Sequence, residues 1–461
     1  MLKRLGVFLL FFLPFFAGSA QDPLEQYVKE GLRNNLALQQ KDFSLQKSLE
    51  ALREAKGMFF PSVSIQARYS RAGGGRLILF PVGDLMNPVF ASLNDLFNYH
   101  GEDAGFPTNL QNEKIPFLRE REQETKIRLV QPIFQPAIYF NYKIKSSLSK
   151  MNMAQVSVFK RQLIADIKTA YYSYSKTLSV VALFEKTREV LEENLRISEK
   201  LVFNGKATED VIFRAKAELA DLDQKMAEAE KNKILAAMYF NFLVNRNLDE
   251  PISTFEKQVL PIPGTINFEK ALQRALNHRN EFQQIQHAIE AVSHRVDLEK
   301  STSFPSVLAV VDYGIQGEDY RFGKDDDYWM ASLIFKLTLF NGNQNKARKT
   351  QALLDKKSFE VQKSELEKQI QLQVEEEYHA LEAARKSVAA ALEKEKSARA
   401  SFIIVSKKFE HGAALQIEYL DARATYTNAS INSIIAHYDF FIQDAQLERA
   451  AALSDLNKYN D

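Results

Sequence analysis

Two carboxylates follow closely on a glycine near the C-terminal end of this 461-residue chain. Glu418 and Asp421 are three positions apart, so both lie on one face of any helix that begins after Gly412. Paired acidic side chains of this kind could attract or hold a cation. A solvated helix face explains the same pair in a chain with 59 acidic residues. Asp210 stands in a comparable place after Gly205, and the residues alone leave both interpretations open.

Other kinds of reactive site find little support. The chain has no cysteine, which excludes disulfides, thiolate metal sites and cysteine nucleophiles. No serine-nucleophile motif is present, and the histidines of one predicted helix lack a metal-ligand spacing. These histidines are His278, His287 and His294. Gly73–Gly75 lack the lysine of a phosphate loop, and Asp325–Asp327 are more simply a solvated turn than a cation site. We therefore expect no enzyme activity, cofactor or metal, and the 60 basic against 59 acidic residues give no support to nucleic-acid binding.

Long helices must position the carboxylates, and the distribution of proline and glycine predicts them. Residues 137–250 contain no proline and a single glycine, Gly205. Residues 343–461 likewise contain no proline and a single glycine, Gly412. Each stretch predicts two helices around a glycine turn, because glycine accepts the positive φ that ends a helix. The first helix of each pair would reach about 100 Å, and an ordinary coiled coil would explain these helices by themselves.

The chain also repeats itself. Phe60-Pro61-Ser62-Val63 recurs as Phe304-Pro305-Ser306-Val307, 244 positions later. The same offset holds from Leu24 to Tyr69 and then falls to 206 or 207, which locates an insertion in the first half. The predicted boundaries are a first repeat at 21–250 with an insert loop at 71–122, a linker at 251–267 and a second repeat at 268–461.

Each repeat predicts two strands of about ten residues, because apolar and polar side chains alternate. The predicted strands are 61–70, 125–134, 305–315 and 328–340, and helical hairpins follow at 137–250 and 343–461. Phe60-Pro61 and Phe304-Pro305 mark the points where a helix stops and a strand begins, since proline disfavours the helical region in the residue before it. Strands of this length match an outer-membrane barrel, but four cannot close one; two copies would supply eight strands and three copies twelve.

The N-terminus predicts export. Lys3 and Arg4 precede an apolar run from Leu5 to Phe16, and Ala17–Ala20 provides small residues for cleavage. We expect residues 1–20 to be a signal peptide. The apolar run is too short to span a bilayer, and no later stretch has the pattern of a membrane helix. A mature chain that enters a membrane would therefore do so as β-structure.

Several motifs in order resemble the bacterial outer-membrane efflux proteins, which are TolC-like channels. They are the opening helix Leu24–Leu38, the paired helix-to-strand junctions, the strand exits Leu129–Phe134 and Leu337–Gly342, the turns at Gly205 and Gly412, and the repeat end Asn247–Ile252. The resemblance implies a mainly α fold with a membrane β-barrel. Three chains would form an α-barrel tunnel of long helices and close a 12-stranded β-barrel. It also implies a passive outer-membrane duct reaching into the periplasm, coupled by a periplasmic adaptor (membrane fusion) protein to an inner-membrane transporter.

The resemblance assigns roles to particular residues. Asp210, Glu418 and Asp421 match acidic positions that form a gate or selectivity ring at the periplasmic tip. The tips themselves match the family's adaptor-docking motif, through Phe203, Gly205, Phe409 and Gly412. Ala414 departs from the family, which places at this position an arginine that helps to latch the closed state. The insert at 71–122 is expected to be an extracellular loop or lid. The alternative interpretation is a periplasmic coiled-coil adaptor or scaffold without a pore.

Overall fold

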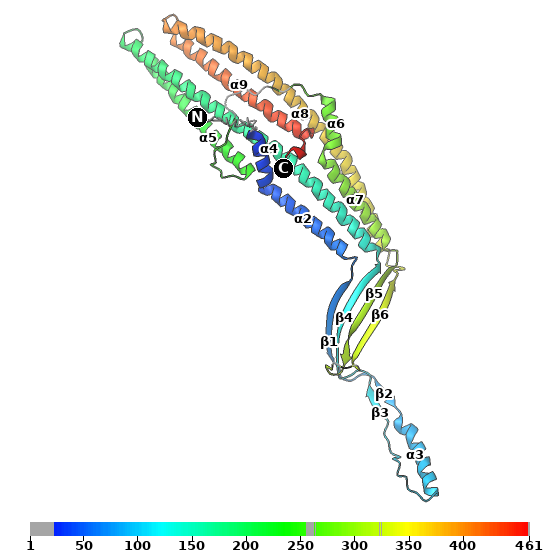
Figure 1. The fold of residues 1–461 in the computed structure, drawn as a ribbon. Coiled ribbons are helices and arrows are strands. Elements are labelled where there is room, and N and C mark those ends of the chain that lie inside the picture. Colours follow the sequence, from blue (N-terminus) through cyan, green and yellow to red (C-terminus); the bar gives the residue numbers. More distant parts are fainter. Residues whose placement is uncertain (1–22, 255–261, 263, 322, 324, 460–461) are drawn as a thin grey trace, which may run out of the picture. The chain divides into compact units, whose positions relative to one another are not determined.

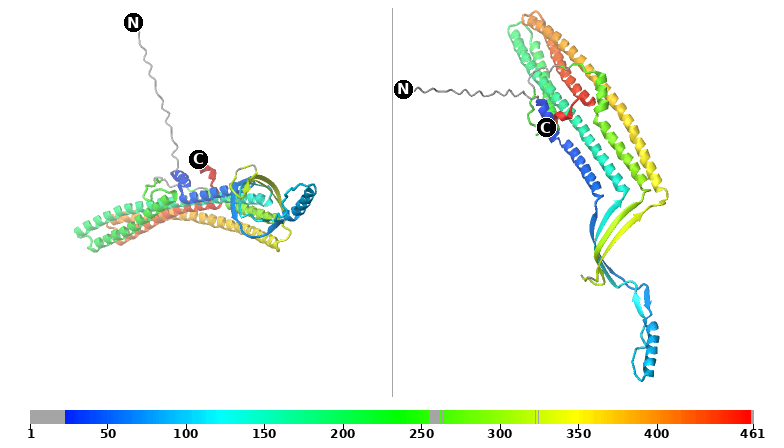
Figure 2. Two further views of the ribbon diagram at one scale, coloured as in Figure 1. Left: turned by 90° about the horizontal axis from the view of Figure 1, so that it is seen from below. Right: turned by 45° about the vertical axis from the view of Figure 1, so that its right-hand side comes forward.

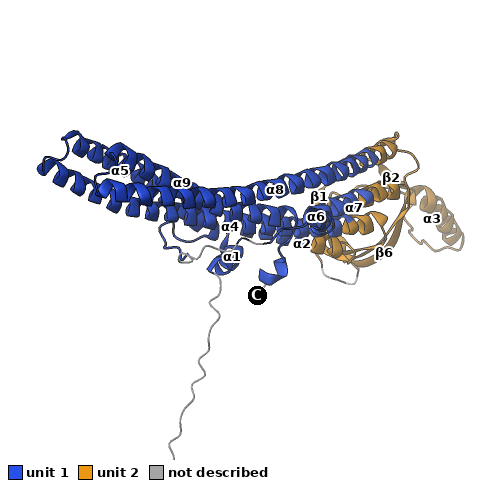
Figure 3. Ribbon diagram, turned by 90° about the horizontal axis from the view of Figure 1, so that it is seen from above, with its two compact units in different colours: residues 1–51, 144–293, 353–461 blue, residues 52–143, 294–352 orange. Residues whose placement is uncertain are grey.

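The computed structural model describes residues 23–459 except 255–261, 263, 322 and 324. The predicted signal peptide, 1–20, lies outside the described residues, as does part of the predicted linker at 251–267. The chain divides into two compact units (Figure 3). Unit 1 contains residues 1–51, 144–293 and 353–461, and unit 2 contains residues 52–143 and 294–352. Both units draw on both sequence repeats.

Unit 2 contains a four-stranded antiparallel sheet in the order β1-β4-β5-β6 (Figures 1 and 2). The strands are β1 (Ser62–Arg71), β4 (Arg121–Phe134), β5 (Ser306–Gly317) and β6 (Asp327–Lys336). Pro61 and Pro305 stand immediately before β1 and β5, after helices that end at Gly57 and Ser301. The two centre strands come from different repeats, so the sheet joins the repeats through β4 and β5.

Two strand boundaries differ from the prediction by four residues, and the others differ by at most two. The last strand, predicted at 328–340, ends at Lys336. Lys336 pairs with Ser306, the first residue of β5, so the residues after Lys336 have no strand to pair with. The second strand, predicted to start at residue 125, already starts at Arg121, because Arg121 pairs with Arg71 at the far end of β1.

The insert at 71–122 contains regular structure and is not simply the predicted loop. It holds the strands β2 (Leu77–Phe80) and β3 (Glu113–Pro116), which pair as an antiparallel ribbon, and the helix α3 (Val82–Tyr99). Pro88 lies inside α3, and the stretch is apolar on more than one side. Both features hide a helix from a search for one apolar face, because proline normally interrupts a helix.

The other described helices belong to two similar series. They are α1 (Pro23–Asn34), α2 (Leu36–Gly57), α4 (Pro136–Phe203), α5 (Asp210–Val244), α6 (Phe268–His278), α7 (Asn280–Ser301), α8 (Gln344–Glu410) and α9 (Gln416–Ala450), with the short 3-10 helix η1 (Leu456–Tyr459). The predicted opening helix, Leu24–Leu38, is broken at Asn35, whose side chain accepts from the Leu38 backbone and donates to the Leu243 carbonyl. The second series breaks at Arg279, which is also 244 positions later.

Within unit 1, each series has its own apolar core. One core gathers side chains from α1, α4 and α5 around Phe240, and the other gathers side chains from α6, α8 and α9 around Phe440. Each core is formed by apolar positions that recur at helical spacing on long helices, and burying them supplies the main stabilisation of such an assembly. Two smaller clusters join the series: Phe184, Leu191 and Leu222 pack with Ile431 of α9, and Phe409 and Tyr419 pack with Ile197 and Leu201 of α4.

The contact between α4 and α9 combines this apolar packing with polar pairs. Along it, α4 and α9 are joined by hydrogen bonds and ion pairs, including Lys176 Nζ to Asp439 Oδ1 at 2.9 Å and Arg449 Nη1 to Gln162 Oε1 at 2.8 Å. Lys168 also pairs with Glu448. Asp444 lies among these groups, where burial and then the neighbouring Glu448 raise the pKa of its carboxyl.

We predict that Asp444→Asn stabilises the protein in a pH-dependent way. A carboxyl whose folded pKa is raised costs stability as pH rises from the unfolded value, near 4, through the folded value. The amide removes that cost, so the midpoint of thermal unfolding, followed by circular dichroism of the helices, should rise at pH 8 and stay unchanged at pH 3. Asp439→Asn, which breaks the pair with Lys176, is the control and should show no gain. An equal gain at both pH values would contradict the assignment.

Candidate functional site

The two turns singled out by the sequence are glycine-terminated helix ends. Gly205 follows α4 with φ +69°, and Gly412 follows α8 with φ +73°. At the first turn the Lys206 N–H donates to the Leu201 carbonyl at 2.8 Å, and at the second the Ala413 N–H donates to the Lys408 carbonyl at 2.7 Å. A positive φ followed by such a backbone bond is a Schellman-type end. Both glycines are therefore required by the backbone.

The two phenylalanines at these turns have different surroundings. Phe203 is 91% exposed at the end of α4. Phe409 is only 9% exposed and stacks on Tyr419 with a centroid distance of 5.0 Å, beside Phe402. Phe203 is thus free to contact another protein. Phe409 instead fastens α8 to α9, and its ring is covered within this chain.

The acidic residues lie on exposed surface after the turns. Glu418 and Asp421 share an exposed side of α9, and the Glu418 carboxylate accepts from the Leu415 N–H at 2.9 Å. That bond is half of a capping box, in which the third helical residue caps the backbone before the helix. Asp210 opens α5, where it accepts from Thr208 and faces Arg214 at 3.5 Å. Each acid therefore has an exposed carboxylate, and two of the three also have local partners.

Two contacts that the sequence did not predict join the turns within unit 1. The Gln416 amide donates to the Val211 carbonyl at 2.8 Å, which ties the start of α9 to α5. Arg423 of α9 pairs with Glu218 of α5 and is almost fully buried. Ala414, where the resembling family has an arginine, packs against the Phe409 cluster. No local sequence pattern marks contacts between residues more than 200 positions apart.

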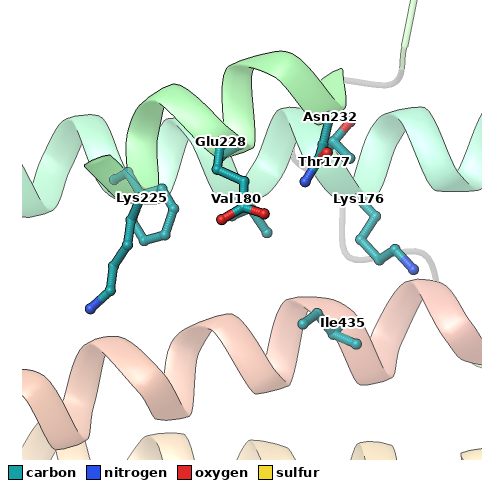
Figure 4. A pocket seen from close by; sticks show the side chains of 9 residues that line it. Lys176, Thr177, Val180, Lys225, Glu228, Asn232 and Ile435 are labelled. Atoms are coloured by element: carbon teal, nitrogen blue, oxygen red, sulfur yellow. The ribbon is translucent and has the colours of Figure 1, made fainter. Parts of the chain in front are cut away.

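A cavity of about 320 Å³ lies among α4, α5 and α9 (Figure 4). Lys225 and Glu228 project from α5 toward α9, which contributes Ile435, and Lys176 comes from α4. Both ammonium groups are neutralised, Lys225 by Asp221 at 2.6 Å and Lys176 by Asp439. The apolar part of the lining comes from Val180, Phe184, Ala229 and Ile435.

The sheet of unit 2 has one apolar face. Its cross-strand register brings together Val63, Leu129 and Val311 in one row, and Ile65, Ile127, Tyr313 and Trp329 in the next. Most of these side chains are exposed, and so are Leu333 and Phe335 further along β6. An apolar surface of this extent marks contact with a partner or a membrane. The rings of Phe60 and Phe304 at the helix-to-strand junctions are exposed as well.

The opposite face of the sheet carries a ladder of charges. The Arg128 guanidinium binds the Asp312 carboxylate through two hydrogen bonds of 2.7 and 2.6 Å. Lys126 lies 2.6 Å from Glu124 and 3.8 Å from Asp312. The Tyr328 hydroxyl donates to Glu124 at 2.7 Å.

This charged ladder (Glu124, Lys126, Arg128, Asp312 and Tyr328) spans the three strands β4, β5 and β6. Asp312 is completely buried. The alternation of charges in residues 124–128 was the available signal, but the partners come from the other repeat. The same face is less polar toward Leu308 and Val310, as the sequence of β5 indicates.

Neither a helix spanning a membrane nor a metal cluster is found in the described part of the chain. None of its helices combines the length and apolar character needed to cross a bilayer. Among the described residues, no three acidic or histidine side chains converge as metal ligands. Asp325–Asp327, the acidic turn of the sequence, therefore belong to no such group.

Comparisons with known proteins confirm the family resemblance. The model of the outer membrane efflux protein family matches residues 271–453. The probable efflux pump outer membrane protein TtgC of Pseudomonas putida is 20% identical over 280 residues, covering 58% of this chain and 55% of that protein. The antibiotic efflux pump outer membrane protein ArpC of Pseudomonas putida matches to the same extent. The chain thus spans about half the length of the curated relatives that it matches.

Solved structures share the fold. The Campylobacter jejuni CmeC outer membrane channel superposes with a TM-score of 0.75 at 16% identity, covering 95% of this chain and 88% of that one. A membrane protein from Pseudomonas aeruginosa gives a TM-score of 0.74 at 16% identity, covering 93% of both chains. The outer membrane protein VceC of Vibrio cholerae gives 0.72 at 14% identity, covering 93% of this chain and 95% of that one.

We predict that Asp312→Asn destabilises the sheet. The change removes the carboxylate that accepts two hydrogen bonds from Arg128, and the single oxygen of asparagine cannot replace that charged, two-bonded pair. Trp329, the single tryptophan, lies on β6, so its fluorescence in a urea titration reports the unfolding of the sheet itself. Asp319→Asn is the control, because that carboxylate is exposed and only 3.7 Å from an exposed Arg321. Equal midpoints for the two variants would contradict a structural role of the ladder.

Proposed function

We propose that this chain, whose residues 271–453 match the outer membrane efflux protein family and whose fold is that of outer membrane channels, is the exit duct of an export system. Three copies close a 12-stranded β-barrel in the outer membrane, and their long helices form a tunnel in the periplasm. The duct is passive. A periplasmic adaptor protein joins it to an inner-membrane transporter of a tripartite efflux or type I secretion system.

The observation that carries this proposal is the sheet of unit 2. It has an exposed apolar face, a charged opposite face, and four strands of which β1 and β6 are the edges. In lipid, an open edge would leave backbone groups unpaired at several kcal/mol each. Pairing β1 of one copy with β6 of the next satisfies both edges. The apolar face then meets lipid and the charged ladder lines the passage.

The turns at Gly205 and Gly412 fit the adaptor contact. Phe203 supplies an exposed aromatic ring beside the first turn, and such rings contribute much of the binding energy in protein interfaces. Phe409 contributes indirectly, by holding the second turn against α9. In this proposal Gln416 and Arg423 hold the turns together in place of the family's latch arginine.

The acids after the turns fit a selectivity ring. Three copies would bring Glu418 and Asp421 together as six carboxylates around one axis, and Asp210 would add a carboxylate from the start of α5, after the turn at Gly205. A ring of carboxylates raises the local concentration of cations and repels anions. The exposure of all three side chains supports this role, since the carboxylates can face ions in an aqueous passage.

A coiled-coil adaptor or scaffold without a pore is the second candidate. The long helices alone would suit it equally well. The sheet disfavours it, because a scaffold in the periplasm has no use for an exposed apolar face on a sheet with two open edges.

We predict that the detergent-solubilised protein has the mass of three chains by light scattering. The trimer should migrate intact on an unheated denaturing gel and as a single chain after boiling, since closed barrels resist detergent. A protein that salt alone releases from membranes, with the mass of one chain, would favour the scaffold and end the duct proposal.

We predict that Glu418→Gln with Asp421→Asn lowers the cation selectivity of single channels in planar bilayers by several-fold. Glutamine keeps the capping bond to the Leu415 N–H, so the variant removes charge without removing the helix cap. The control is Glu367→Gln with Asp249→Asn, which removes two exposed acids elsewhere. If both variants keep the selectivity of the unmodified channel, these acids do not form the ring.

A further inference from the structure

The insert between β1 and β4 carries a second surface without a partner. The Ala72 N–H donates to the Glu120 carbonyl at 3.0 Å, and the Phe117 N–H donates to the Arg76 carbonyl at 2.9 Å. These bonds continue the pairing of β1 with β4 toward the ribbon of β2 and β3. The insert is therefore a hydrogen-bonded extension of the β1–β4 hairpin. It continues from the end at Arg71 and Arg121, which is opposite to the end at Pro61 and Phe134.

One face of α3 is covered by the returning chain. The Asn87 side chain accepts from the Leu110 N–H at 2.8 Å and donates to the Leu110 carbonyl at 3.0 Å. Asn94 makes the same two bonds with Phe106, at 2.9 and 2.8 Å. Phe106 also stacks on Phe90. Gly83 completes this face, since a Cβ there would lie 2.2 Å from the Leu110 carbonyl oxygen.

The other face of α3 is apolar and exposed. It consists of Leu85, Val89, Ser92, Leu96 and Tyr99, the α3 stripe. Leu85 is 62% exposed and Tyr99 is 86% exposed. The spacing of four, three, four and three residues is that of a coiled-coil seam, in which two or more helices bury such stripes against each other. Within the described residues, this seam faces no other helix.

We propose that the α3 stripes of three copies pack against one another and form a parallel three-helix cap over the outer mouth of the duct. The inference rests on the proposed trimer. A rotational axis carries each α3 to the same height, so identical residues of the stripe meet in layers. Ser92, a small residue in the middle of the stripe, lets the helices approach closely there.

The dimensions allow this contact. Strands lie about 4.8 Å apart, so four strands per copy separate neighbouring inserts by roughly 20–25 Å around the rim of a tilted barrel. The helices of a bundle lie about 8–10 Å apart. An 18-residue helix is about 27 Å long, so each needs to lean inward by only several ångströms along its length.

Charge favours sister copies over a lipid surface as the occupant. From Leu77 to Asn112 the chain has no lysine or arginine and four acids. Helices that lie on membranes carry basic residues for anionic headgroups. Asp84 and Asp95 lie to one side of the stripe, where they stay in water when the stripe is covered.

The test uses the absence of cysteine from the chain. Ser92→Cys places one thiol in the stripe, and Asn98→Cys places one on an exposed part of α3 that points away from it. In the full-length trimer, a short bismaleimide should link Ser92→Cys into covalent dimers at least ten-fold faster than Asn98→Cys, at a rate independent of protein concentration. Adding Leu85→Lys and Leu96→Lys should abolish the link while the mass stays trimeric, and adding Asp95→Lys should leave it.

The outcomes separate the cap from the duct. A trimeric mass with equal linking of both cysteine variants overturns the cap and leaves the proposed function standing. A monomeric mass overturns both. A lipid-facing helix would show no linking, together with a blue shift of an environment-sensitive dye on Ser92→Cys when phosphatidylglycerol vesicles are added, and that result also overturns the cap.

Discussion

The pairing of backbone groups at the two edges of one sheet is the constraint on which the remaining structure depends. In the described chain β1 pairs only with β4, and β6 only with β5, so each edge strand has a row of donors and acceptors facing outward. Proteins normally cover or charge such edges, because they recruit further strands. Here the edge strands carry exposed apolar side chains on one face. In the proposed duct, assembly with sister copies would pair both edge strands and would turn the apolar face toward lipid.

The duplication explains how one chain supplies two hairpins of such a sheet. The helix breaks at Asn35 and Arg279 and the strand starts at Ser62 and Ser306 each lie 244 positions apart. The backbone plan is therefore shared by the repeats, whereas the side chains have diverged. Phe203 is exposed and Phe409 is buried at equivalent turns. Each repeat also has an apolar core of its own, and α4 and α9 join these cores through ion pairs and through apolar contacts such as the stack of Tyr172 on Phe441.

Much of the backbone plan could be predicted from the sequence, since it is written in local patterns. Proline and glycine positions indicate the long helices and their turns, and alternation indicates the strands. The helix α3 of the insert could not be predicted in this way. It contains Pro88 and carries apolar side chains on more than one side, so neither periodicity nor the proline rules identify it. The contacts of Asp312, Gln416 and Arg423 could not be predicted, since each partner lies roughly 200 positions away and no local rule selects it. The shared helix face of Glu418 and Asp421 could be predicted, because it depends only on their spacing along the chain.

The charged ladder adds a reason why the sheet keeps one register. Side chains alternate between faces, so a slip of one residue between β4 and β5 would carry Asp312 from Arg128 to the apolar side. In lipid, that move would place an unpaired carboxylate among hydrocarbon chains and leave two cations without it. Apolar side chains can contact lipid as favourably as they contact one another, so they select no particular strand register in a membrane. The charged ladder does select one, because only one register brings its opposite charges together. In the proposed barrel, assembly would then need to determine only the pairing of β1 with β6 of the next copy, because the three pairings inside the chain are already fixed.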